Sequence, residues 1–100
     1  MVRLSDKQLT DVKGLEKLTK LRSLDLSNNK LTEVPKELEK CTQLTHLNLQ
    51  VNQLTNVKGL EKLKRLKKLH IYNNPALTKA QIAELQKALL KCRISSNPKK

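Results

Sequence analysis

A leucine pattern that recurs every 22 or 23 residues is the feature that most constrains the fold of this chain. The pattern LxxLxLxxNxL begins at Leu21, at Leu44 and, with its last apolar residue displaced by one position, at Leu66. A partial copy at residues 2–9 has Lys7 in place of the asparagine. A fixed period of this length is typical of proteins built from stacked structural repeats.

Each copy of the pattern predicts a short strand followed by a turn. Two leucines alternate with polar residues, so one face of the strand is buried and the other is exposed. The asparagine comes where the chain leaves the strand, and its amide can satisfy backbone groups of neighbouring turns. Each turn exposes a leucine face that only the next turn can cover, so the stability of the whole depends on stacking.

Over roughly residues 1–77, the sequence resembles the leucine-rich repeat family at the positions described above. The segments at 12–18 and 57–63 resemble the 22-residue class of bacterial internalins and of the phosphatase-1 regulatory subunit. The middle segment, with Val34 and Pro35 and one more residue, resembles the class of 23 or 24 residues. The resemblance implies an α/β solenoid, a right-handed coil with a concave parallel sheet of about four strands, and non-covalent binding of a partner.

The heptapeptide VKGLEKL occurs at residues 12–18 and again at 57–63, between the asparagine and the next LxxL. This position in the repeat predicts that both heptapeptides lie on the back of the coil, where Gly14 and Gly59 suit a compact turn. The middle turn has Pro35 instead, and we expect it to be helical for about one turn. The residues expected to point inward are Val12, Leu15, Leu18, Val34, Leu38, Cys41, Val57, Leu60 and Leu63. Because Cys41 occupies a leucine slot, it is expected to be a core thiol.

The C-terminal segment predicts a cap over the last turn. Thr78 and Gln81 form a capping-box pattern at the start of a helix over about 79–91. Its apolar stripe consists of Ile82, Leu85, Leu89 and Cys92. We expect Ile94 to add a last apolar contact before a frayed tail. This pattern resembles, more loosely, the C-terminal caps of small bacterial repeat proteins.

One hundred residues and 11.4 kDa accommodate a single domain. We divide it into a half repeat with its back segment (1–20), three repeats (21–43, 44–65, 66–77), a helical cap (78–94) and a tail (95–100). No cap precedes Val2, so we expect a monomer or self-association through this N-terminal edge. The sequence shows neither a membrane span nor a secretory signal, which predicts a cytoplasmic protein or a truncated secreted one.

The exposed strand positions differ from turn to turn while the framework repeats, which favours a non-catalytic module that binds a peptide or a small protein patch. Val51 and Tyr72, the only aromatic residue, form the expected centre of this surface. Tyr72 could equally shield the last strand against the cap. The candidate partner-binding residues are Arg3, Asp25, Ser27, His46, Asn48, Gln50, Val51, Lys68, His70 and Tyr72.

Positive charge is concentrated in the second part of the chain. Residues 1–40 carry nine basic and seven acidic groups, and residues 41–100 carry twelve and two, within a formal net charge of +12. This imbalance suggests an alternative function, binding of a polyanion such as nucleic acid or an acidic surface. A lysine coating that keeps a leucine-rich protein soluble would look the same. The candidate polyanion patch is Lys62, Lys64, Arg65, Lys67, Lys68, Lys91 and Arg93.

Catalysis, cofactors and metals are not indicated by the sequence. Asp25, Ser27 and His46 could be drawn as a catalytic triad, but they are expected on an open surface without an oxyanion hole. His46 and His70 lack a third ligand nearby. A third interpretation is that the near-identical segments and scarce aromatics belong to an engineered scaffold, or to a fragment of a longer array, without a ligand of its own.

Overall fold

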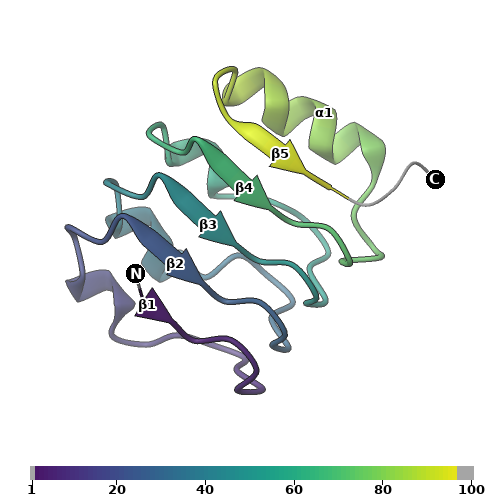
Figure 1. Ribbon diagram of the computed structural model, residues 1–100. Helices are drawn as coiled ribbons and strands as arrows, with labels where there is room; N and C mark the ends of the chain where they lie inside the picture. The colour runs from purple at the N-terminus through teal and green to yellow at the C-terminus, as the bar shows by residue number, and fades with distance from the viewer. Residues whose placement is uncertain (1, 97–100) are drawn as a thin grey trace.

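The computed structural model describes residues 2–96. The chain winds through successive turns, each with a short strand on one side and a short helix on the other (Figure 1). In chain order the elements are β1 (Val2–Arg3), η1 (Leu15–Lys17), β2 (Ser23–Asp25), η2 (Lys36–Lys40), β3 (His46–Asn48), η3 (Leu60–Lys62), β4 (Lys68–His70), α1 (Lys79–Ala88) and β5 (Arg93–Ser95), where η denotes a 3-10 helix.

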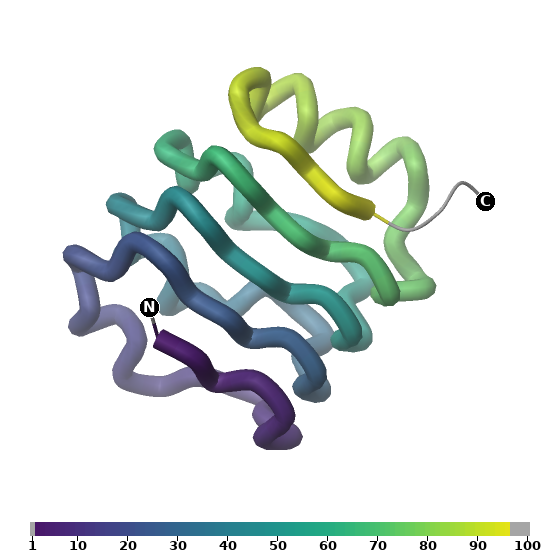
Figure 2. Tube along the Cα trace, in the orientation of Figure 1, coloured from purple at the N-terminus to yellow at the C-terminus, as the bar shows by residue number. Residues whose placement is uncertain are grey.

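All five strands form one parallel sheet in the order β1-β2-β3-β4-β5 (Figure 1). The trace in Figure 2 shows the successive turns of the chain lying side by side. Their central residues stand in register, with Leu24 paired with Leu47, Leu47 with Leu69, and Leu69 with Ile94. The fold class is therefore the predicted one, an open α/β solenoid. Within residues 2–96, β1 has a neighbour on one side only, and pairing of its other edge with a second chain stays a prediction.

The sheet has one strand more than the approximately four that were expected, because the chain returns after α1 and forms β5. The Arg93 N–H donates to the Lys67 carbonyl at 2.8 Å, and the Ile71 N–H donates to the Ser95 carbonyl at 2.8 Å. These bonds satisfy backbone groups on the far side of β4 that would otherwise need water or another partner. Ser95, expected in a frayed tail, belongs to this strand; residues 97–100 of that tail lie outside the described part.

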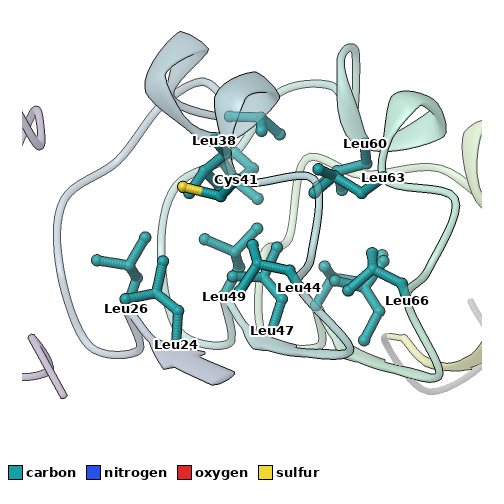
Figure 3. Close-up of a cluster of buried hydrophobic side chains, with 14 of the residues drawn as sticks. Leu24, Leu26, Leu38, Cys41, Leu44, Leu47, Leu49, Leu60, Leu63 and Leu66 are labelled. Carbon is teal, nitrogen blue, oxygen red and sulfur yellow. The ribbon is translucent and has the colours of Figure 1, made fainter. Parts of the chain in front are cut away.

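The core is a stack of leucines between the strands and the helices of the back. Figure 3 shows Leu24 and Leu47 from the strand side and Leu38 and Leu60 from the back. Cys41 lies in the same layer and is fully buried, as expected from its leucine slot. Burying one leucine side chain contributes roughly 1.5 to 3 kcal/mol, so the stack is the main source of stability.

The back segments confirm most of the expected turn chemistry. Gly14 (φ 98°) and Gly59 (φ 100°) precede η1 and η3 in a left-handed conformation that glycine adopts without steric cost. Pro35 precedes η2, which is five residues long instead of three. Leu18 is a correction: its side chain is 42% exposed, because no other described turn packs on that side of the first one.

The cap begins as predicted and ends earlier. Thr78 and Gln81 form both bonds of the capping box, and α1 starts at Lys79. The helix stops at Ala88 rather than near residue 91, because the chain turns there to enter β5. Gln86 Nε2 donates to the carbonyls of Leu89 and Cys92 and so fixes this turn. Among residues 2–96, none of the helices has the length and apolar character to cross a membrane.

Candidate functional site

The exposed side of the sheet, which we call the concave face, is the candidate site. It carries the polar residues that flank the buried centre of each strand and those that follow it. One row consists of Ser23, His46, Lys68 and Arg93, which are register partners on successive strands. A second row consists of Arg3, Asp25, Asn48, His70 and Ser95. Gln50, Val51 and Tyr72 follow these rows where the chain leaves β3 and β4.

A ladder of buried asparagines fixes the turns beneath this face. Asn52 Oδ1 accepts from the Leu31 N–H of the preceding turn at 3.1 Å, and Asn52 Nδ2 donates to the Leu26 and Leu49 carbonyls at 3.1 Å each. Asn29 and Asn74 make the corresponding bonds one turn earlier and one turn later. Each amide therefore joins two turns, as expected from its place in the repeat.

The residue just before each asparagine position takes the same unusual backbone conformation in every turn. The φ angles are 58° at Asp6, 55° at Asn28, 55° at Val51 and 60° at Asn73. At Val51 the N–H donates to the Tyr72 carbonyl at 3.1 Å, and at Asn28 it donates to the Gln50 carbonyl at 3.1 Å. Asparagine and aspartate tolerate this left-handed region, whereas a β-branched residue is strained there.

Val51 therefore stands out in two ways. Its side chain is 37% exposed, so it gains only part of the free energy of burial, and its backbone is strained. Tyr72 is half-buried, and its ring meets His70 edge to face with centroids 6.2 Å apart. Sequence reasoning selected both residues for their apolar character; the strain at Val51 became visible only in the backbone.

Ser27 requires a correction, because it is buried and not available to a partner. Its hydroxyl donates to the Asp25 carboxylate at 2.7 Å, and its N–H donates to the same oxygen at 2.9 Å. His46 does not join them, since its Nδ1 lies 2.9 Å from the Thr45 hydroxyl oxygen. The three residues that could be drawn as a triad are thus not connected as one. Asn48 repeats the local bond of Asp25, accepting from the Gln50 N–H at 3.0 Å.

His70 lies in the second row and is half-buried between its neighbours on β3 and β5. Its Nδ1 atom is buried and has no hydrogen-bond partner in the described part of the chain. Across the same residues, no three His, Cys, Asp or Glu side chains come together as a candidate metal site.

The residues of the predicted polyanion patch lie on different parts of the molecule. Lys62 on the back forms an ion pair with Glu39 at 3.3 Å, and Arg65 Nη1 donates to Gln43 at 3.0 Å. Lys64 and Lys91 line a separate hollow of about 170 Å³ beside the end of α1. Of the residues of this patch, Lys68 and Arg93 stand on the concave face itself.

Arg93 was expected in the polyanion patch. The sequence did not predict that Arg93 lies beside Lys68 on the concave face, or that Ser95 lies on this face as well. The signal was present, because Arg93, Ile94 and Ser95 alternate polar, apolar and polar like the residues of β4. It was hidden because no LxxL precedes it.

Both cysteines are buried thiols of the core. Burial raises the pKa of Cys41, to which Glu16 adds a further increase, and burial raises the pKa of Cys92. Cys41 Sγ donates to the Leu15 carbonyl at 3.4 Å. A thiol with a raised pKa is a poor nucleophile at neutral pH, so these groups contribute packing.

Comparison with known proteins identifies the repeat. A family model described as leucine rich repeat matches residues 2–54, and one described as leucine rich repeats in two copies matches residues 42–87. A leucine-rich repeat protein of Leptospira interrogans is similar over 95% of this chain and 25% of its own, with 35% identity and a TM-score of 0.83. An internalin of Listeria monocytogenes shares the fold over 98% of this chain and 35% of its own, with 24% identity and a TM-score of 0.75. The chain thus spans only a quarter to about a third of these two proteins.

Proposed function

Because this chain belongs to the leucine-rich repeat family, we propose that it is a non-catalytic interaction module whose concave face binds a peptide or a small patch of a protein. The repeats supply a rigid scaffold, and the variable strand positions supply the contacts. The proposed contact residues are Arg3, Asp25, His46, Asn48, Gln50, Val51, Lys68, His70 and Tyr72, to which β5 adds Arg93 and Ser95.

The observation that carries this proposal is Val51. The other turns hold Asp6, Asn28 or Asn73 at its position, residues that suit a left-handed backbone. Valine there costs about 1 to 2 kcal/mol of conformational strain. Strain of this kind tends to persist at binding sites. The exposed methyl groups beside Tyr72 form an apolar spot that a partner would cover.

Replacing Val51 by asparagine tests the proposal, because stability and binding should change in opposite directions. Val51→Asn should stabilise the protein by about 1 kcal/mol as the strain is relieved. It should also weaken capture of the partner from a lysate of the source cell, and Tyr72→Ala should do the same. The measurements are urea unfolding and quantitative mass spectrometry of the captured proteins.

Glu33→Asn, an exposed change beside η2, is the matched control and should leave capture unchanged. The proposal would be refuted by a Val51→Asn protein that captures the same proteins in the same amounts as the wild type.

A further inference from the structure

Two cations, Lys68 and Arg93, stand on the C-terminal half of the concave face, and Arg3 stands on its first strand. The side chains that β3, β4 and β5 present on this half include no carboxylate. The acidic residues of this face, Asp6 and Asp25, stand in the first two turns. Asp25 is moreover engaged by the hydroxyl and the N–H of Ser27.

Lys68 and Arg93 stand directly opposite one another on β4 and β5. Neighbouring strands lie about 4.8 Å apart, and like charges facing each other across two strands destabilise a sheet. Both side chains are exposed, and within residues 2–96 no carboxylate forms an ion pair with either of them. Packing and pairing of the strands therefore give no reason for this arrangement.

The pair is close enough to act as one binding element. The separation of the strands is shorter than the Debye length of about 8 Å at physiological ionic strength, so both charges act on the same anionic group. Asp25 lies two strands away from Lys68, roughly 10 Å, and is largely screened from it. A ligand carboxylate at Lys68 and Arg93 would relieve their mutual repulsion.

The same face holds the strained, exposed Val51 and the half-buried Tyr72. Tyr72 follows Lys68 by four residues, which corresponds to about 13 Å at the rise of an extended chain. In an extended peptide, side chains four positions apart point to the same side and are separated by the same distance. The cation pair and the apolar spot thus match two side chains of one extended segment.

We propose that the partner segment is an extended acidic peptide, with an aspartate or glutamate against Lys68 and Arg93 and an apolar side chain four positions away against Val51 and Tyr72. The proposal rests on the proposed function and names the chemical class of its ligand. Two features of this face lower the stability of the fold, namely the like-charge pair and the strained valine. Binding of a single ligand would explain why both are present. A nucleic acid would also satisfy the cations, but nucleic-acid binders usually stack several bases on aromatic side chains, and this chain offers Tyr72 alone among Phe, Trp and Tyr.

Peptide selection on the full chain tests this proposal. A display library of random 12-residue peptides is selected on the immobilised protein at physiological salt, and enriched sequences are synthesised for fluorescence anisotropy. We expect Asp or Glu to be enriched four positions from an apolar residue. Affinity should fall about tenfold or more in Lys68→Glu/Arg93→Glu, because a ligand carboxylate then meets two like charges.

The control is Lys13→Glu/Lys58→Glu, two exposed lysines that each precede a back-turn glycine. Both double variants lower the formal net charge of +12 by the same amount, so general attraction between a basic protein and an acidic peptide changes equally. The control should retain the affinity to within about twofold, since these lysines stand at the turns of the back and not on the concave face. A peptide with lysine in place of its acidic residue should regain binding to Lys68→Glu/Arg93→Glu, which also shows that this variant is folded.

Three results would overturn the inference, and they are distinguishable. Peptides that lose binding in Val51→Asn/Tyr72→Ala, but not in Lys68→Glu/Arg93→Glu, would refute the acidic ligand and leave the concave face as the binding surface. Peptides insensitive to both double variants would refute the inference and the proposed function together. A single-stranded 12-nucleotide RNA that competes with the peptides and binds more tightly at the same salt would identify the cation pair as part of a nucleic-acid site instead.

Discussion

Single side chains carry the contacts that hold one turn to the next. The amides of Asn29, Asn52 and Asn74 each accept from a backbone N–H of the preceding turn and donate to a carbonyl there. A leucine stack alone would leave these buried backbone groups unpaired, and each such group costs about 1 to 3 kcal/mol. The asparagine is therefore as much a part of the repeat as its leucines.

We expect alanine at these positions to destabilise the protein, and to do so more where the lost hydrogen bonds are more deeply buried. Asn52→Ala leaves the buried Leu31 N–H without a partner and should lower the free energy of unfolding by about 3 kcal/mol. Asn29→Ala should cost about 1 to 2 kcal/mol, because water can replace its part-buried bonds to Lys7 and Leu9. Urea unfolding with a fixed m-value measures both changes.

Asn56→Ala serves as the control, since its side chain accepts only the exposed N–H of Lys58, and it should be nearly neutral. Equal losses at Asn29 and Asn52 would contradict the role of burial.

At the scale of elements, the C-terminal cap is the part that differs most from the repeats. It combines α1, which closes the apolar end of the stack with Leu85 and Leu89, with β5, which closes the hydrogen-bonded edge of the sheet. Helix and strand are coupled through the turn that Gln86 holds. Stability of the helix and placement of Arg93 on the concave face therefore depend on each other.

Removing the N-cap of α1 should weaken this unit measurably. The Thr78 hydroxyl accepts from the Gln81 N–H at 3.1 Å, and the Gln81 side chain accepts from the Thr78 N–H at 2.9 Å. Thr78→Ala should lower the free energy of unfolding by about 1 kcal/mol, the usual contribution of such a cap. Thr19→Ala, at an exposed threonine, is the control in thermal unfolding. A Thr78→Ala protein as stable as this control would show that the stacking of Leu85 and Leu89 alone fixes the helix.

At the scale of the molecule, the two ends of the stack are unequal. The same three apolar positions of the repeat recur in each turn. In the first turn they are occupied by Val2, Leu4 and Leu9, which are only half-buried. Their counterparts Leu47, Leu49 and Leu54 in the third turn are at most 1% exposed. Because each turn is stabilised chiefly by its neighbours, the first turn should open more readily than the rest.

Native-state hydrogen exchange can measure this difference on equivalent bonds. The N–H groups of Leu4, Leu26 and Leu49 donate to the next strand at 2.8, 2.8 and 2.7 Å, so the three bonds are nearly equal in length while Leu4 is less buried than Leu26 and Leu49. We expect Leu4 to exchange at least about tenfold faster than Leu49, with Leu26 between them or equal to Leu49. Identical protection of all three amides would mean that the molecule opens as one cooperative unit.

The sequence by itself determined the repeat, the parallel order of its strands, the asparagine ladder, the glycine turns of the back and the start of the capping helix. These features follow from local pattern, because the turns repeat the same spacing of leucine, share an asparagine in three copies and a glycine in two, and can be compared with one another. Cys41 was predictable for the same reason, since its position is occupied by leucine elsewhere in the chain.

Only the tertiary structure decided the features that depend on what lies beside a residue. Leu18 is exposed because its turn is the first in the described stack, and Ser27 is buried with its hydroxyl satisfied by Asp25. β5 forms because β4 has an edge to be paired, and that pairing places Arg93 beside Lys68. The strain at Val51 arises because the neighbouring turns impose a left-handed backbone regardless of the side chain.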